Sequence, residues 1–270
     1  MLYIKENYII QKVLRKALSF TGKNYVQGIS IKTKNDTHDL VTSLDLRVNH
    51  LIVRELGRIF PHDAIMSEET SPQMPPFEGR TWVIDPICGT SNASRGISIF
   101  STNVSLVEKN KVVAAWVADH LLKRIIWSLG NEKVYINKKS EQPLLRRSDF
   151  TTFNMDTGYL YRLSKDIRVR FVDFMREVIL DGNSHVCSFN SSLAFAYVAS
   201  GQIQSSVTIN VFAWDIFAAC FLIEQNGGLV THYDGTPWTL KSKSVLMSSE
   251  KNIHQYLLDI LKKHHLEKIK

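Results

Sequence analysis

Residues Thr81–Asn92 read Thr-Trp-Val-Ile-Asp-Pro-Ile-Cys-Gly-Thr-Ser-Asn. The run Trp82-Val83-Ile84 is short and apolar, which is typical of a buried β-strand. A proline follows Asp85, and because it lacks an N–H donor it predicts that the strand ends there. Gly89 and the polar residues after it predict a turn and then the start of a helix. Asp85 is therefore expected beside free backbone amides, an arrangement that suits a metal ion and a phosphate.

Three other acids are found at the edges of expected elements. Glu68 follows the apolar run Ala64-Ile65-Met66, and Asp215 stands at the start of an apolar helix. Asp45 forms a capping box with Thr42 at the start of a helix that runs to Ile59, and capping alone would explain it. Taken together, hard oxygen ligands at loop edges indicate Mg²⁺ and the metal-assisted transfer of a phosphoryl group to water.

The rest of the chain alternates between expected helices and expected strands. Helical spacing predicts helices over about 4–18, 167–180, 193–199, 214–223 and 253–261. Strands are expected at about 101–107 and 112–117, joined as a hairpin, and at 124–127, 134–136, 151–154, 204–209, 229–231 and 244–247. This alternation predicts a layered α/β architecture. We expect one domain over 1–270, with lobes of about 1–145 and 146–270 that meet in the polar segment 142–149.

The composition is that of an ordinary globular protein, with 44% hydrophobic and 22% charged residues among 270. No apolar run reaches the roughly 18 residues of a membrane span. There is no signal-peptide pattern, and the three cysteines are an odd number, so a reducing cytoplasm is expected. The net charge of +7 is partly due to the basic end 261–270. Most of it is interpreted as solvated surface, with nucleic-acid binding as an open alternative.

Four motifs in order resemble the inositol monophosphatase family of Mg²⁺-dependent, lithium-sensitive phosphatases. They are Asp39-Leu40-Val41-Thr42-x-x-Asp45 preceded by Lys34, then Ser67-Glu68-Glu69, then the stretch from Trp82 to Asn92, and finally Trp214-Asp215 followed by Glu224-Gln225-Asn226-Gly227-Gly228. One such motif would be weak, but four with matching spacing cover nearly the whole chain. The resemblance implies a five-layered αβαβα sandwich of the inositol monophosphatase/fructose-1,6-bisphosphatase type.

The resemblance also implies roles by position. Glu68, Asp85 and the carbonyl of Ile87 would hold a first Mg²⁺, and Asp85 with Asp215 would hold a second. Thr90, partnered with Glu68, would orient the attacking water, and Asp45 would support that network. The substrate and its phosphate would be bound at Gly89, Thr90, Ser91 and Asp215, with Lys34 nearby. The family often forms homodimers, so a homodimer acting on a small phosphorylated metabolite is expected.

The chain departs from the family at Cys88, where the motif has a second metal-binding aspartate. A thiol is a poor ligand for Mg²⁺, so the second site should be weakened. Three outcomes follow: a catalytically inactive protein, hydrolysis with one well-held metal or with Mn²⁺ or Zn²⁺, or an exposed reactive thiol whose pKa is lowered by the helix N-terminus.

A second departure concerns the substrate. Inositol-specific members have a glutamate where this chain has Thr208, and a hydroxyl accepts fewer hydrogen bonds from a sugar than a carboxylate does. Inositol phosphate, histidinol phosphate, nucleotide phosphates and sugar phosphates therefore all remain open. Two hypotheses result: a metal-dependent phosphomonoesterase, or a family member that has lost catalysis and acts as a binding or regulatory protein.

Overall fold

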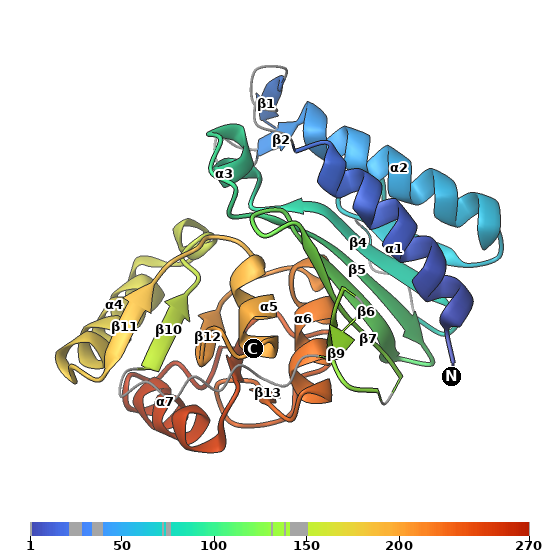
Figure 1. The fold of residues 1–270 in the computed structure, drawn as a ribbon. Helices are drawn as coiled ribbons and strands as arrows, with labels where there is room; N and C mark the ends of the chain where they lie inside the picture. The colour runs from blue at the N-terminus through green and yellow to red at the C-terminus, as the bar shows by residue number, and fades with distance from the viewer. Residues whose placement is uncertain are drawn as a thin grey trace.

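Two large β-sheets and three layers of helices alternate through the part of the molecule that the structure describes (Figure 1). The computed structural model describes residues 2–21, 29–33, 40–71, 73, 77–130, 132–137, 139–140 and 151–269. Helices α1 (Ile4–Ser19) and α2 (Ser43–Ile59) cover one sheet, α5 (Leu193–Ala199) and α6 (Ala213–Gln225) lie between the sheets, and α4 (Lys165–Leu180) and α7 (Lys251–Lys263) cover the other. The αβαβα layering expected from the resemblance is confirmed.

The larger sheet has seven strands in the order β3-β4-β5-β6-β7-β8-β9. Their bounds are Ala64–Ser67, Thr81–Cys88, Ser101–Glu108, Lys111–Asp119, Arg124–Leu129, Tyr135–Ile136 and Lys139–Ser140. Strands β3 and β4 are parallel, and each later pair is antiparallel, including the predicted β5–β6 hairpin. Strand β4 is buried for seven of its eight residues because it has neighbours on both sides and helices on both faces.

The smaller sheet has five strands in the order β11-β10-β12-β14-β13. Their bounds are Ser184–Cys187, Thr151–Met155, Ser205–Thr208, Val245–Ser248 and Leu229–Thr231. Strand β11 was not predicted, because Ser184-His185-Val186-Cys187 has no apolar run to mark it. The short β1 (Ile31–Thr33) and β2 (Leu40–Thr42), which form a two-stranded sheet, were also missed.

The helices differ in how much of their surface they bury. Helices α1 and α2 each bury one apolar stripe against the large sheet, as their spacing predicts. In α6 every residue from Ala213 to Ile223 is buried, because this helix lies between the two sheets. The five-residue helix α3 (Thr90–Ser94) follows β4, and a 3₁₀ turn covers Leu160–Arg162. Helix α6 therefore holds Asp215 rigidly opposite the end of β4.

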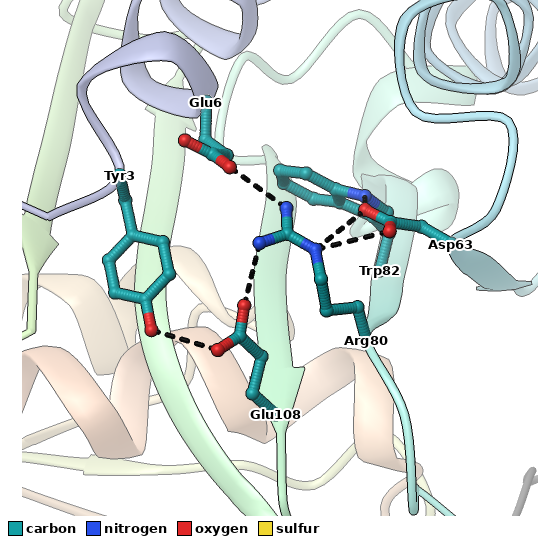
Figure 2. Close-up of polar contacts among 6 residues, drawn as sticks. All are labelled: Tyr3, Glu6, Asp63, Arg80, Trp82 and Glu108. Carbon is teal, nitrogen blue, oxygen red and sulfur yellow. Dashed lines mark hydrogen bonds and ion pairs between the residues drawn. The ribbon is translucent and has the colours of Figure 1, made fainter.

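An ionic cluster fixes the start of β4 (Figure 2). The Arg80 guanidinium donates to Glu6 at 2.9 Å, to Glu108 at 2.7 Å and to both oxygens of Asp63 at 3.1 Å. Tyr3 Oη donates to Glu108 at 3.0 Å, and Trp82 Nε1 donates to Asp63 at 2.8 Å. The cluster joins α1, the turn after α2, and strands β4 and β5, so each carboxylate in it has a positively charged or N–H partner.

Two expected features fall outside the described residues, namely Lys34 and the lobe boundary at 142–149. Among the residues that the structure does describe, no helix combines the length and apolar character needed to cross a membrane.

Candidate active site

Asp85 lies within β4 and not at its end. The strand continues through Pro86 to Cys88, with Asp85 paired to Asn103 and Cys88 paired to Ser101. The register shifts between those two pairs, so a β-bulge accommodates the proline that was expected to end the strand. The predicted strand end was therefore wrong by three residues. Bulges redirect side chains, and this one lies where β4 meets the cavity.

The parallel pairing of β3 with β4 brings Glu68 beside Asp85. Ser67 pairs with Ile84, and the Glu68 amide donates to the Ile84 carbonyl at 3.2 Å. Glu68 is half-buried and lines the same cavity as Asp85. Two carboxylates on neighbouring strands therefore face one space.

Asp85 is 1% exposed, and neither of its carboxylate oxygens has a hydrogen-bond donor among the described residues. Burial raises the pKa of Asp85 well above its usual value, and the charges of Glu68 and Asp215 raise it further. A buried carboxylate without a donor is costly in a folded protein. A bound cation would supply the missing partner.

Asp215 approaches from α6. Its Oδ2 accepts a hydrogen bond from the Phe212 amide at 2.8 Å, which leaves Oδ1 directed toward β4. The Cys88 thiol donates to that Oδ1 at 3.7 Å, and the Ser192 amide donates to the Cys88 sulfur at 3.2 Å. Burial raises the pKa of Asp215 to about 8 despite the Phe212 hydrogen bond, which acts in the opposite direction.

Cys88 is not the exposed, activated thiol that was one of the three predicted outcomes. It is half-buried, and burial followed by the charges of Asp85 and Asp215 raises its pKa well above the usual value. Each of these three side chains offers a ligand atom, and the three atoms lie within 4.8 Å of one another.

Thr90 lines the cavity, and Asp45 lies behind it. The capping box is present as predicted, with the Thr42 amide donating to Asp45 Oδ2 at 2.9 Å. Thr90 Oγ1 donates to Asp45 Oδ1 at 2.8 Å and to the Ile87 carbonyl at 3.0 Å. Burial raises the pKa of Asp45 to about 6. The structure thus links Thr90 to Asp45, and its partnership with Glu68 remains a prediction.

The turn after β4 depends on one glycine. Gly89 has a φ of +102°, and an added Cβ would lie 3.0 Å from the Ser191 Cβ and 3.1 Å from the Ile99 carbonyl. Only glycine combines this backbone angle with so close a neighbour. The amides of Gly89, Thr90 and Ser91 precede the first helical hydrogen bond of α3, which runs from Asn92 to the Gly89 carbonyl.

A single cavity collects most of the predicted site residues. Its lining includes Glu68, Asp85, Ile87, Cys88, Gly89, Thr90, Ser91 and Asp215. Asp45 contacts the cavity through Thr90. Thr208 is fully buried in β12, where it donates to Asp156 at 2.9 Å.

Several lining residues were not predicted. Asp156 follows β10 and is 8% exposed, with its Oδ1 accepting from the Gly158 amide at 3.0 Å. Arg162 lies over the rings of Tyr159, at 5.0 Å, and Phe212, at 5.8 Å. Ser191 and Ser192, before α5, bind Cys88 through its carbonyl and its sulfur. Asp156 could have been predicted as a site residue, because it follows an expected strand as Glu68 does.

The side chains fit a divalent cation. A buried carboxylate without a donor, a second carboxylate with one oxygen hydrogen-bonded to the Cys88 thiol and a half-buried glutamate all line one cavity. Charged groups of one sign are tolerated at such density when an ion of the other sign binds between them.

A layered αβαβα fold that presents clustered acids beside a glycine turn defines a class of metal-dependent phosphatases. Residues 4–266 match the inositol monophosphatase family, and the chain belongs to this family. The family is Mg²⁺-dependent.

Curated relatives cover nearly the whole chain. The Nus factor SuhB of Pasteurella multocida is 24% identical over 247 residues, covering 91% of this chain and 92% of that protein. The inositol-1-monophosphatase of Bacillus subtilis is 23% identical over 262 residues, covering 93% and 94%.

Solved structures agree in fold. The Thermotoga maritima IMPase has a TM-score of 0.83 at 24% identity and covers 98% of this chain and 99% of its own. An IMPase/NADP phosphatase complexed with Mg²⁺ and phosphate has a TM-score of 0.82 at 20% identity, covering 97% and 96%. At these identities the likeness is one of fold.

Proposed function

We propose that this protein is a metal-dependent phosphomonoesterase that hydrolyses a small phosphate ester. The observation that carries the proposal is the buried Asp85 carboxylate, which lacks a donor among the described residues and lines one cavity with Glu68 and Asp215. Family membership supports phosphatase chemistry, and the cavity supports a phosphorylated metabolite of modest size.

Glu68, Asp85 and the Ile87 carbonyl would hold one cation, and Asp85 with Asp215 would hold another. Bound Mg²⁺ would polarise the phosphate and lower the pKa of the attacking water. Mn²⁺ and Zn²⁺ are further candidates because Cys88 lies at the second position. The first-turn amides of Gly89 and Thr90 would donate to phosphate oxygens.

Two side chains of this protein would position the attacking water and accept its proton. Thr90 donates its hydroxyl proton to Asp45, so its oxygen would accept a hydrogen bond from the water. Glu68, which lines the same cavity, would accept the proton that the water loses. Inositol, histidinol, nucleotide and sugar phosphates all remain candidates, because Asp156 lines the cavity and the buried Thr208 donates to it from outside the lining.

A phosphate-release panel tests the proposal. Purified protein is assayed on these esters with Mg²⁺, Mn²⁺ or Zn²⁺. We expect turnover that Glu68→Gln lowers by about 10³-fold, as for loss of a catalytic proton acceptor, while Glu69→Gln retains it. No turnover on any ester by wild type, with Cys88→Asp restoring it, would show instead that the natural chain has lost catalysis.

A second candidate, nucleic-acid binding, is favoured by the outer face of α1 and α2. These helices carry seven lysines and arginines against three acids, of which Asp45 is buried and Glu6 binds Arg80. A groove between them is lined by Lys16, Arg47, His50 and Arg54, by one acid, Glu55, and by Phe20, Leu46 and Leu51. Two curated relatives, from Pasteurella multocida and Haemophilus influenzae, are named Nus factor SuhB.

Salt-dependent binding to a single-stranded RNA oligonucleotide tests this second candidate. We expect Arg47→Ala with Arg54→Ala to lower the slope of log affinity against log salt by about 1 to 2. The control pair Lys251→Ala and Lys262→Ala, on α7, should leave the slope unchanged. Equal effects of the two pairs would indicate general charge attraction only.

The homodimer and the two lobes of one domain also remain proposals, and sedimentation equilibrium tests the dimer.

A further inference from the structure

The second metal position of this chain combines one sulfur and two carboxylates. Its ligand atoms come from β4, where Asp85 and Cys88 flank a bulge, and from the first turn of α6, where Asp215 lies. In the family motif the Cys88 position is an aspartate, so an all-oxygen set has become a mixed set. Sulfur changes which cations the position prefers.

The spacing of these atoms matches a compact coordination shell. The Cys88 sulfur lies 3.7 Å from Asp215 Oδ1. Metal–oxygen and metal–sulfur bonds of about 2.1 and 2.3 Å place adjacent tetrahedral ligands about 3.6 Å apart. The third ligand atom, from Asp85, lies within 4.8 Å of both. Small side-chain adjustments would therefore bring all three to one ion.

An independent observation points to a ligand here. Asp85 is 1% exposed, lines the cavity and has no donor to either oxygen in the described part of the chain. A cysteine beside an acidic pair would not by itself indicate a site. The buried Asp85 carboxylate does indicate one, because a bound cation would supply the partner that its two oxygens do not have.

Neighbouring backbone groups already orient two of the ligands. The Ser192 amide donates to the Cys88 sulfur at 3.2 Å, and the Phe212 amide donates to Asp215 Oδ2 at 2.8 Å. Such second-layer hydrogen bonds hold ligands in place and stabilise the charged form of a sulfur ligand. The cavity next to all three residues leaves room for a further ligand from substrate or solvent.

We propose that Asp85, Cys88 and Asp215 form a thiolate–dicarboxylate site that selects a borderline or thiophilic divalent cation, of which Zn²⁺ is the type, over Mg²⁺. The proposal deepens the proposed function, on which it rests for the presence of a cation in this cavity. On binding, the Cys88 sulfur forms a bond to the cation and its proton passes to solvent. The oxidation states of sulfur and metal do not change.

Cobalt substitution tests the site without measuring activity. Metal-free protein is titrated with Co²⁺, which reports a sulfur ligand through a near-ultraviolet charge-transfer absorption. We expect this absorption in wild type and in Cys187→Ser, a control at another half-buried cysteine, and its loss in Cys88→Ser and Cys88→Asp. Calorimetry should show that Cys88→Asp lowers the ratio of Zn²⁺ to Mg²⁺ affinity by about tenfold or more.

The outcomes separate this proposal from the proposed function. Co²⁺ binding without the charge-transfer absorption in wild type, or an unchanged Zn²⁺ to Mg²⁺ ratio in Cys88→Asp, would overturn the sulfur-containing site even if phosphate release is robust. The absorption together with an absence of phosphate release would support the site and contradict the phosphatase. Circular dichroism verifies that each variant is folded. If Cys88→Asp does not fold, Cys88→Ser takes its place in the Co²⁺ and calorimetric measurements.

Discussion

At the start of β4, Arg80 lies among Glu6, Asp63 and Glu108, and five residues later Asp85 lies with Glu68 and Asp215. Both places gather three carboxylates. At the first, every carboxylate accepts a hydrogen bond from the guanidinium, with Trp82 and Tyr3 adding two more donors (Figure 2). At the second, Asp85 has no donor among the described residues, and the pKa values of Asp85 and Asp215 are raised.

The difference separates a structural cluster from a functional one. In the Arg80 cluster the cation is part of the chain, so the charges stabilise the fold as it stands. In the Asp85 site the carboxylates of Asp85, Glu68 and Asp215 repel one another until a cation binds. The metal-free fold is therefore less stable than it would be without them. Removing a charge should therefore have opposite effects on the free energy of unfolding at the two places.

The largest effect is expected at Arg80. Arg80→Met leaves three largely buried carboxylates without their cation. We expect the free energy of unfolding to fall by about 3 kcal/mol, somewhat below a fully buried pair because the Arg80 side chain is 33% exposed. Urea unfolding measures the change. Arg58→Met, which breaks an exposed pair with Glu55, is the control and should cost far less than Arg80→Met. Similar losses for both variants would contradict a structural role for the cluster.

A smaller effect of opposite sign is expected at Asp85. In metal-free protein, Asp85→Asn removes a buried acid that meets the charges of Glu68 and Asp215, so the free energy of unfolding should rise by about 1 kcal/mol. Asp63→Asn, the matched change in the Arg80 cluster, should lower it because Asp63 accepts from Arg80 and Trp82. Urea unfolding in the presence of a chelator compares the two. A loss of stability in Asp85→Asn would remove the contrast.

The raised pKa of Asp215 should also make the stability of metal-free protein depend on pH. Asp215 has its pKa raised from 3.8 to about 8, so the folded state holds a proton that the unfolded state has released over that range. Stability from this group is therefore complete below about pH 4 and is lost as the pH rises toward 8. Asp215→Asn should make the unfolding free energy of metal-free protein fall less steeply between pH 4 and 8. An identical slope in wild type and variant would show that Asp215 does not titrate abnormally.

The smallest effect is expected at the edge of the Arg80 cluster. Tyr3→Phe removes the hydrogen bond from Tyr3 to Glu108 but leaves the Arg80 ion pairs in place. We expect a loss of about 0.5–1 kcal/mol, readily measured as a shift in thermal midpoint. A loss as large as that of Arg80→Met would mean that the phenol, and not the guanidinium, holds the cluster together.

Local signals account for what could be predicted from sequence. The spacing of apolar residues identified α1 and α2, and Thr42 with Asp45 identified the capping box. Pro86 misled because its missing N–H was interpreted as the end of the strand, whereas a bulge between Asp85 and Cys88 keeps the strand paired. The motif order indicated that Glu68, Asp85 and Asp215 belong together, and the cavity confirms their proximity.

Contacts between distant parts of the chain could not be predicted in this way. The Ser192 amide reaches Cys88 across 104 residues, and Arg80 pairs with Glu6 across 74. Neither pair has a local pattern, because each depends on how the layers pack. The raised pKa of Cys88 has the same origin, since burial beside Asp85 and Asp215 outweighs the helix N-terminus that suggested a lowered one.

The most direct test of the difference between the Arg80 cluster and the Asp85 site is the thermal midpoint of metal-free protein with and without Mn²⁺. A cation that binds only the folded state raises the midpoint. We predict a clear rise in wild type, the same rise in Tyr3→Phe and little or none in Asp85→Asn. Equal rises in wild type and Asp85→Asn, or no rise in any of them, would contradict a cation site at Asp85.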